Sequence, residues 1–155
     1  MLHKEKFKHK VQVTVRNNEI DWQGVVHNAV YLHYFEVGRM SYFDKIGFPI
    51  KLDNPLNLEW KVVIGRNEID YRSPARFNEV LNVHTRISWI RNTSFAIEGF
   101  VEEEGSGRLI AENVSLHVWL DKLTGKPMMV PVFFRRNVRE YEGKDALIQE
   151  PTIAV

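Results

Sequence analysis

The sequence predicts an α+β fold in which a curved antiparallel sheet wraps around one long helix. Three observations support this class. A strand-like stretch comes first, an almost wholly apolar helical pattern follows it, and four long strand-like segments fill most of the remaining chain. One helix and one succession of antiparallel strands are most simply packed as two layers, with the helix on one face of the sheet.

The first strand is predicted from strict alternation near the N-terminus. Val11, Val13 and Val15 fall on one side of the stretch "HKVQVTVRNNEID", and Gln12 and Thr14 fall on the other. A period of two indicates a strand with one buried face.

The helix is predicted from about Asn28 to Ile46, where apolar residues recur every three or four positions. They are Val30, Tyr31, Tyr34, Phe35, Val37, Met40, Phe43 and Ile46. A helix that is apolar over most of its circumference is normally enclosed by other elements. Gly47 and Pro49 are typical of a helix end, because glycine suits the C-terminal cap and proline cannot continue the helix.

Four further strands are expected over residues 59–72, 79–90, 94–104 and 108–121. They are joined mainly as antiparallel hairpins by the short links "SPARFN", "RNT" and "GSG". A short helix opened by Pro131 should follow, and the tail shows no clear partner. We therefore expect a polar N-terminal segment over 1–9, a single domain over 10–142 and a C-terminal tail over 143–155.

Composition excludes several classes of protein. The 155 residues carry 21 Lys and Arg against 20 Asp and Glu, a balance that disfavours a dedicated nucleic-acid binder. The absence of cysteine excludes disulfides, a thiolate nucleophile and thiolate metal ligands. No apolar run suits a secretory signal or membrane insertion, so we expect a cytoplasmic protein. The edges and open face of such a sheet favour self-association.

Asp21 raises the first chemical question, because it stands three residues before Gly24 at the mouth of an apolar helix. An aspartate at such a place is often a helix cap or a turn former. It is equally a candidate general base or nucleophile, since a helix start offers unpaired N–H groups that stabilise an oxyanion. The N–H groups near His27 and Asn28 occupy that place, and Gly24 would allow a tight turn.

The stretch "DWQGVVHNAVYLHYFEVGRMSYFDKIG" resembles the signature of hotdog-fold acyl-CoA thioesterases of the 4-hydroxybenzoyl-CoA thioesterase type. The matching positions are Asp21, Gly24, Val25, Val26, Asn28 and Tyr31, with Glu36 and Arg39 as an E-x-x-R step. The segments "IDYRSPARFNEVL", "RNTSF" and "DKLTGKPMMVP" resemble later motifs of the same family. The resemblance covers about residues 10 to 140 in the family's order.

This resemblance implies an acyl-CoA thioesterase of the hotdog fold, which needs no cofactor and no metal. Asp21 would act as base or nucleophile, the Asn28 N–H would polarise the carbonyl, and Gly24 would give the substrate clearance. The expected substrate-binding residues are Trp22, Val26, His27, Tyr31 and Arg91, the last holding a phosphate of CoA. The active site would lie between the subunits of a homodimer or homotetramer.

Three departures from the family pattern leave the acyl group open: Glu19 replaces a frequent aspartate, Trp22 is bulky, and His27 replaces a common tyrosine.

Two other functions stay open. A 3-hydroxyacyl thioester dehydratase would need His27 and Glu36 at one site, and a non-catalytic module would bind acyl-CoA without turnover. Trp22 either lines the acyl pocket or covers the helix end, and Arg91 is otherwise a solvated turn residue. Glu36 and Arg39 are expected to form an ion pair at i, i+3 spacing.

Overall fold

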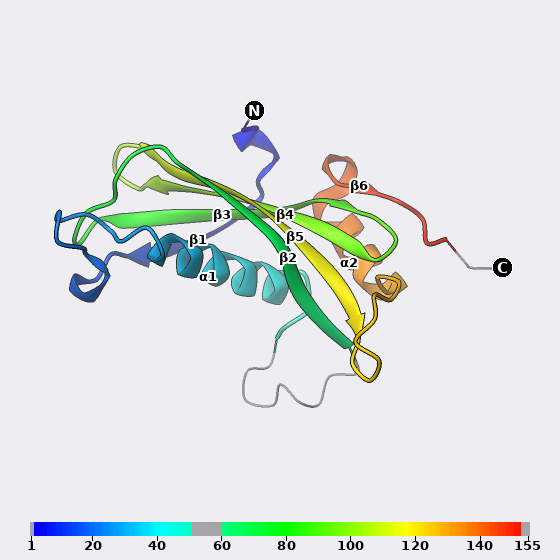
Figure 1. Cartoon of the computed structure of the whole chain (residues 1–155). Helices are drawn as coiled ribbons and strands as arrows, with labels where there is room; N and C mark the ends of the chain where they lie inside the picture. The colour runs from blue at the N-terminus through cyan, green and yellow to red at the C-terminus, as the bar shows by residue number, and fades with distance from the viewer. Residues whose placement is uncertain (1, 51–59, 153–155) are drawn as a thin grey trace.

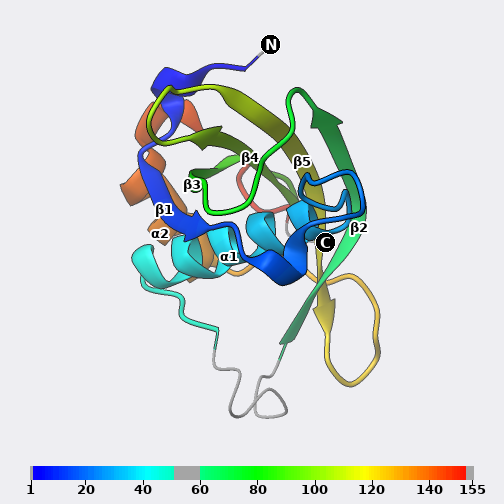
Figure 2. The same ribbon diagram turned by 90° about the vertical axis from the view of Figure 1, so that its left-hand side faces the viewer.

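The computed structural model describes residues 2–50 and 60–152, so the segment "KLDNPLN" lies outside the described residues. Its α+β arrangement is the predicted one: a curved sheet wraps around one long helix (Figures 1 and 2). The strands are β1 (His9–Thr14), β2 (Trp60–Tyr71), β3 (Val80–Ile90), β4 (Ser94–Glu103), β5 (Leu109–Asp121) and β6 (Leu147–Ile148). The helices are α1 (Val30–Lys45) and α2 (Val132–Glu142), with short 3-10 turns at Lys4–Lys6, Asn17–Glu19 and Gly143–Asp145.

The strand order in the sheet is β1-β3-β4-β5-β2, and all these neighbours are antiparallel. The links "RNT" and "GSG" form the expected hairpins between β3, β4 and β5. The link "SPARFN" does not join neighbours, because β2 pairs with β5 while β3 pairs with β1 and β4. Ala75 in this link is fully buried, and its carbonyl accepts the Val26 N–H at 2.9 Å. The link is therefore docked beside the chain that leads into α1.

Alternation explains how the sheet presents one face to α1. In β5, residues 111, 113, 115, 117 and 119 are buried, whereas the residues between them are more exposed. The buried positions of α1 recur every three or four residues, as one face of a helix requires: Tyr31, Tyr34, Phe35, Gly38, Arg39, Tyr42 and Phe43. The two buried faces meet and form the core.

Two glycines allow α1 to approach the sheet closely. A Cβ atom on Gly38 would lie 2.6 Å from the Thr85 hydroxyl oxygen and 2.8 Å from a methyl carbon of Val83, both on β3. A Cβ atom on Gly99 of β4 would lie 2.9 Å from the ring of Phe35. Neither position has room for a larger side chain, so these glycines set the depth at which α1 sits.

The second helix closes the other end of the core. Phe134 and Val138 of α2 pack in one buried cluster with Phe43 and Trp119. The tail, which showed no pattern in the sequence, adds β6 to β3 in parallel. The buried guanidinium of Arg135 ties these parts together by donating to four carbonyls, those of Val130, Gln149, Arg91 and Asn92, at 2.6–3.0 Å.

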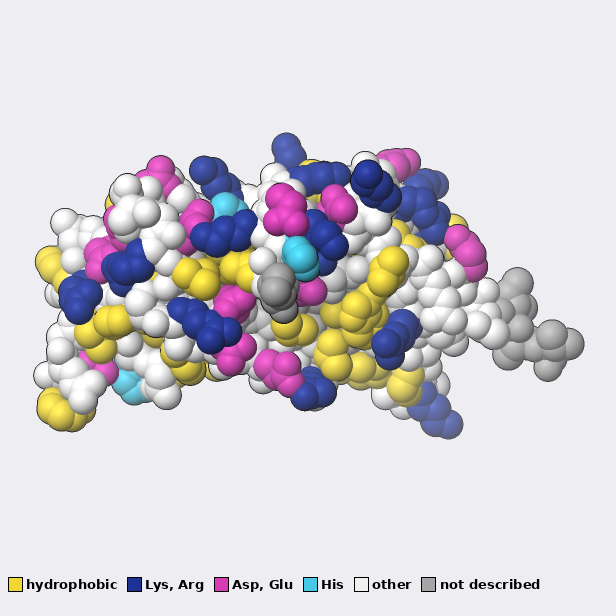
Figure 3. All heavy atoms as spheres, turned by 90° about the horizontal axis from the view of Figure 1, so that it is seen from above, with side chains coloured by type: hydrophobic (Ala, Val, Ile, Leu, Met, Phe, Trp, Pro, Cys, Tyr) yellow, Lys and Arg dark blue, Asp and Glu magenta, His cyan; other side chains and the backbone are white. Residues whose placement is uncertain are grey.

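Charges of both signs are interspersed on the outer face of the sheet, and Figure 3 shows no broad region of a single sign on this face. Ion pairs account for part of this mixing, among them Arg72–Glu112 at 2.6 Å and Arg86–Glu98 at 2.9 Å. None of the helices within residues 2–50 and 60–152 is long and apolar enough to cross a membrane.

Candidate active site

Asp21 begins a tight hairpin just before α1. Its N–H donates to the Val25 carbonyl at 2.8 Å, the Gly24 N–H donates back to the Asp21 carbonyl at 3.1 Å, and Ile20 bridges Val26. Gly24 has φ of +80°, a conformation that side chains with a Cβ rarely adopt, and no atom lies within 4 Å of the place of its missing Cβ. The predicted tight turn at Gly24 is present, and clearance for the substrate at Gly24 stays a prediction.

The carboxylate of Asp21 is held by one oxygen only. Its Oδ1 accepts the N–H groups of Gln23 at 2.8 Å and Val25 at 3.4 Å. Its Oδ2 has no hydrogen bond or ion pair to any residue that the structure describes. The turn therefore fixes the direction of the carboxylate and leaves one oxygen for another partner.

The peptide N–H groups just before α1 differ in whether they have an acceptor among the described residues. The helix begins at Val30, two residues later than predicted. The His27 N–H donates to the Glu19 carbonyl at 2.9 Å, and the Ala29 N–H donates to Nδ1 of His27 at 3.1 Å. The expectation that His27 supplies a free donor is therefore wrong. The Asn28 N–H has no acceptor among the described residues, so it remains as the candidate.

Tyr71, at the end of β2, holds the peptide that follows Asn28. Its hydroxyl donates to the Asn28 carbonyl at 3.0 Å, and its ring packs edge-on against Tyr31 with centroids 5.4 Å apart. The Tyr31 hydroxyl in turn accepts the Ala75 N–H at 3.2 Å. We did not predict Tyr71 as a site residue, although it stands in the quoted motif "IDYRSPARFNEVL".

These groups meet in one open cleft of about 480 Å³ at the N-terminal end of α1. The start of α1 and the end of β2 lie at the same end of the molecule (Figure 1). The lining residues are Asp21, Trp22, Gln23, Val25, Val26, His27, Asn28, Tyr31, Tyr71, Arg72, Ser73 and Pro74. Every predicted catalytic and substrate-binding residue is among them except Gly24, which belongs to the turn, and Arg91.

Exposure differs sharply along the cleft. Val26 and Tyr31 are 3% and 4% exposed, and they belong to the core, whereas Trp22 is 91% exposed at the rim. Burial raises the pKa of the Tyr31 hydroxyl, so it is uncharged at neutral pH. Trp22 does not cover the helix end within this chain. An indole so exposed is available to a ligand or a second copy.

Arg91 lies apart from the cleft. It is exposed in the turn between β3 and β4, and its guanidinium stacks over the Trp89 ring at 4.5 Å. The structure of one chain therefore does not bring Arg91 to Asp21. A role for Arg91 in holding CoA stays a prediction.

A polar scaffold fixes the cleft wall formed by the 73–79 link. Arg108 donates to the Pro74 carbonyl at 2.5 Å and to the Ser73 hydroxyl at 3.1 Å, and it pairs with Glu79. Glu79 also accepts the Arg76 N–H at 2.9 Å. The Glu79 of the quoted motif is therefore a structural residue that holds this wall in place.

Glu19, a departure from the family pattern, is also structural. Its Oε1 accepts the Tyr34 hydroxyl at 3.0 Å and the Arg16 N–H at 2.7 Å, while its carbonyl accepts the His27 N–H. Burial, followed by the hydrogen bond and negative charge of Glu19, raises the pKa of Tyr34. Glu19 therefore fixes the chain on which Asp21 stands and does not itself line the cleft.

The residues of the dehydratase alternative are separated. His27 lines the cleft, but Glu36 lines a different cavity farther along α1. Glu36 and Arg39 do not form the expected ion pair among the described residues; Glu36 is exposed, and Arg39 is buried. No group of three or more potential ligands among His, Asp and Glu could hold a metal ion in the part of the chain described.

Comparison with known proteins identifies the family. The model of the thioesterase-like superfamily matches residues 15–138. The chain is 33% identical over 135 residues to the acyl-acyl carrier protein thioesterase ATL2, chloroplastic, of Arabidopsis thaliana, covering 87% of this chain and 68% of that protein. It is 31% identical over 121 residues to the putative acyl-CoA thioesterase YneP of Bacillus subtilis, covering 77% and 84% respectively.

A solved structure supports the same family. A thioesterase from Thermus thermophilus, crystallised in complex with coenzyme A and Zn, matches with a TM-score of 0.76 at 31% identity. The match covers 90% of this chain and 98% of that one. The predicted hotdog fold is confirmed by this likeness together with the curved sheet around α1. The chain therefore belongs to the thioesterase-like superfamily, and it is a thioester hydrolase of the hotdog fold.

Proposed function

We propose that the protein is an acyl-CoA thioesterase, which converts an acyl-CoA and water into a free carboxylic acid and CoA. One observation carries the proposal. The free Oδ2 of Asp21 and the free N–H of Asn28 belong to the same cleft, at the start of a helix. Thioester hydrolysis needs these two elements, a group that activates or delivers the nucleophile and a donor that stabilises the oxyanion.

The oxyanion would form at the start of α1. As the carbonyl carbon is attacked, its oxygen gains negative charge and accepts the Asn28 N–H. The unpaired donors and dipole of the helix start favour an anion there. Tyr71 would keep the adjoining peptide in place through the Asn28 carbonyl.

Two roles for Asp21 satisfy the chemistry. As a base, Asp21 takes a proton from water while the water oxygen bonds to the carbonyl carbon; the C–S bond then breaks, and the sulfur leaves as thiolate and takes up a proton. As a nucleophile, Asp21 bonds to the carbonyl carbon and expels the thiolate, and water then hydrolyses the mixed anhydride. Both routes consume one water and give the acid and CoA.

Two of the relatives support CoA as the carrier by their names, and the Arabidopsis relative supports an acyl carrier protein. One relative is named a putative acyl-CoA thioesterase, and a solved relative holds coenzyme A. The Arabidopsis relative is named an acyl-acyl carrier protein thioesterase. Matched acyl-CoA and acyl-carrier-protein substrates therefore belong in one assay, and a kcat/KM for the carrier-protein form above that for CoA would contradict the choice of CoA.

We further propose that a second copy completes the site. β2 is the last strand in the order, no other strand in the described residues pairs with its outer edge, and its final residue, Tyr71, lines the cleft. Unpaired strand edges favour pairing with another chain. A partner along β2 would wall the open side of the cleft and cover exposed apolar residues such as Ile64 and Trp22, which are 47% and 91% exposed. A monomer by analytical ultracentrifugation at assay concentrations would contradict this proposal.

The test of the proposed function is an Asp21→Asn variant assayed by thiol release from a panel of acyl-CoAs. The amide keeps the acceptor oxygen that the turn uses and cannot act as base or nucleophile. We expect kcat to fall by about a hundredfold or more, a loss of about 3 kcal/mol of transition-state stabilisation. Acyl-CoA binding and the thermal midpoint should persist. The matched control is Asp44→Asn, an exposed aspartate near the far end of α1. Undiminished hydrolysis in Asp21→Asn would end the proposal.

A further inference from the structure

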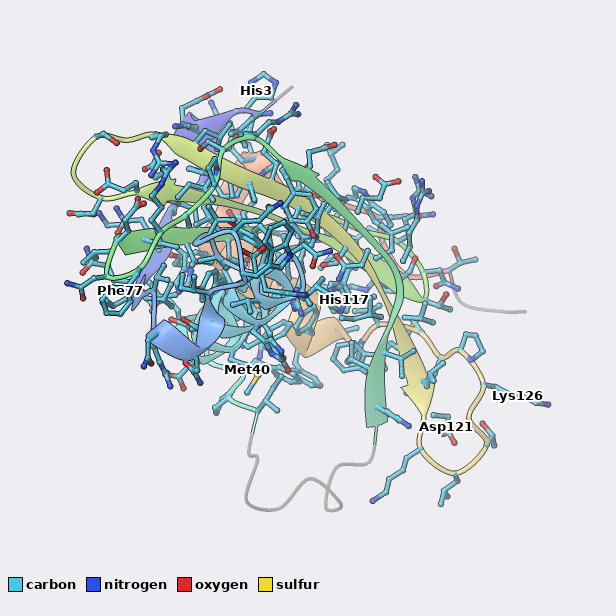
Figure 4. The ribbon with its side chains drawn as sticks, turned by 60° about the vertical axis from the view of Figure 1, so that its left-hand side comes forward. His3, Met40, Phe77, His117, Asp121 and Lys126 are labelled. Atoms are coloured by element: carbon cyan, nitrogen blue, oxygen red, sulfur yellow. The ribbon has the colours of Figure 1, made fainter. Side chains whose placement is uncertain are left out.

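A second cavity lies on the same helix, away from the cleft. It holds about 170 Å³ between α1, β2, β4, β5 and α2, and none of the residues that line it also lines the cleft. Its walls are mostly apolar and aromatic, with Met40, Phe43, Val62 and Phe134 among them. In Figure 4 the labelled Met40 and His117 mark its α1 and β5 sides.

Arg39 makes this cavity unusual. Its side chain lines the cavity and is only 8% exposed, and its Nη1 is buried without a hydrogen-bond partner. No carboxylate among the described residues lies within ion-pair distance of it, and Glu36, one turn earlier, is exposed. Burial lowers the pKa of Arg39, but an arginine stays charged in proteins. A buried charge without a partner is strongly unfavourable, and the described residues supply no anion to this one.

The opposite wall does not supply that anion. His117 on β5 is 4% exposed, and its Nε2 lies 2.9 Å from the Ser115 hydroxyl. Burial first, and then the positive charge of Arg39, lowers the pKa of His117 to about 3, so the imidazole is neutral at pH 7. Among the described lining residues, Glu36 and Arg39 carry the only charges, and the Glu36 carboxylate is solvated.

We propose that this cavity binds a carboxylate attached to an apolar group about the size of one aromatic ring, with Arg39 as its counterion. The guanidinium offers a planar fork that matches a carboxylate, and the aromatic walls suit an apolar body. The volume fits this class, since a cavity of about 150 Å³ lined by apolar side chains holds one benzene molecule. A purely alkyl group would fill the space and leave Arg39 unpaired.

Two sources would supply such an acid. One is a free carboxylic acid that enters the cavity by itself. The other is the far end of an acyl group that carries a second carboxylate, and this reading rests on the proposed thioesterase function. For the second source, the acyl group would have to extend about 14 Å along the helix, because Arg39 lies nine residues after the first residue of α1.

The binding test uses calorimetry with benzoate and hexanoate, and with benzamide as a neutral probe of the same shape. We expect one saturable site for the acids and affinity at least about tenfold weaker for benzamide. Arg39→Met should weaken acid binding by about tenfold or more, whereas Glu36→Gln should leave it unchanged or strengthen it. Arg39→Lys keeps the charge and should retain measurable binding, which guards against a folding defect in Arg39→Met.

Further measurements distinguish acid binding at this cavity from the proposed hydrolysis, and distinguish a free acid from the end of an acyl group as the ligand. Asp21→Asn should bind benzoate as the wild type does, so a failure of the proposed hydrolysis leaves this test intact. If the acyl group reaches the cavity, benzoate competes with substrate and Arg39→Met lowers kcat/KM for an ω-carboxyacyl-CoA more than for its methyl-ended analogue. If a free acid is the ligand, benzoate binds without competition. Any of three results would overturn the proposal: benzoate binding that does not saturate, benzamide binding as tight as that of benzoate, or unchanged benzoate affinity in a folded Arg39→Met variant.

Discussion

Asp21 forms a turn, which is one of the two roles that the sequence offered as alternatives. Its Oδ1 accepts the N–H groups of Gln23 and Val25, and its Oδ2 has no partner among the described residues, as the proposed catalytic role requires. Local side-chain to backbone bonds of this kind are common for aspartate, so the turn was predictable from Asp21 and Gly24. The sequence could not predict that only one of the two carboxylate oxygens is hydrogen-bonded, because this depends on the direction in which the turn holds the carboxylate.

Tyr71 gives a residue-scale prediction. A Tyr71→Phe variant keeps the ring packed on Tyr31 and loses the hydrogen bond to the Asn28 carbonyl. We expect kcat to fall about five- to tenfold with little change in KM, because a lost hydrogen bond of about 1 kcal/mol would loosen a donor used in the transition state. Steady-state kinetics measure the split. Tyr141→Phe, away from the cleft, is the control, and an unchanged kcat in Tyr71→Phe would rule out the positioning role.

Residue types could not have predicted that the Asn28 N–H is unpaired among the described residues or that Tyr71 holds its peptide. The neighbouring N–H groups are paired: that of His27 donates to the Glu19 carbonyl, and that of Ala29 donates to the His27 ring. Backbone donors look alike in a sequence, and only their pairing distinguishes them. Tyr71 reaches Asn28 across 43 residues, a separation that no local pattern reveals.

At the scale of elements, sequence patterns predicted α1 and the long strands to within a few residues. Burial alternates in β1 and β5, whereas β3 and β4 are buried at most positions. Pairing was harder to predict. The short link over 72–79 looked like a connection between neighbours, but β2 crosses to the far side of β5. β6 is only two residues long, too short to show alternation.

Gly38 gives an element-scale prediction. Gly38→Ala would gain about 1 kcal/mol of helix propensity, but its Cβ would press on Val83 and Thr85. Overpacking of a core costs about 1–3 kcal/mol, so we expect a net loss of about 1–2 kcal/mol in the free energy of unfolding. Urea denaturation measures this loss. Thr85→Ala removes one contacting atom, and a double-mutant cycle should show coupling of about 0.5 kcal/mol or more. A more stable Gly38→Ala would show that α1 can move away from β3.

At the scale of the whole molecule, buried histidines link stability to acid. Burial lowers the pKa of His9, His84 and His117, the last to about 3 from 6.5. A lowered pKa means that the unfolded chain binds more protons, so stability is full above about pH 6.5 and falls as the pH falls. For His117 alone, the loss between neutral pH and pH 5 is about 2 kcal/mol.

The measurement is chemical denaturation at neutral pH and at about pH 5, for the wild type and for His117→Gln. The variant should lose about 2 kcal/mol less than the wild type between the two conditions. Glu142 contributes with the opposite sign, because burial raises its pKa, but it is common to both proteins and cancels in the comparison. Equal acid sensitivity of the two proteins would show that His117 is protonated without unfolding.

The assembly also belongs to this scale, because the sequence predicted self-association from open sheet edges. No described strand pairs with the outer edge of β2, beside the cleft. Arg91 remains far from Asp21 within one chain, so its predicted contact with CoA depends on how copies associate. Sequence patterns give no register for such an association, since it joins two chains.

The most direct measurement is a crystal structure of the Asp21→Asn variant with an unhydrolysed acyl-CoA bound. We expect the thioester oxygen about 3 Å from the Asn28 nitrogen, with the side chain at position 21 facing the carbonyl carbon. We also expect Arg91 of a second copy to lie at a phosphate of CoA. A thioester bound elsewhere, or one whose oxygen is turned away from Asn28 while the position 21 side chain contacts no part of the substrate, would contradict this mechanism.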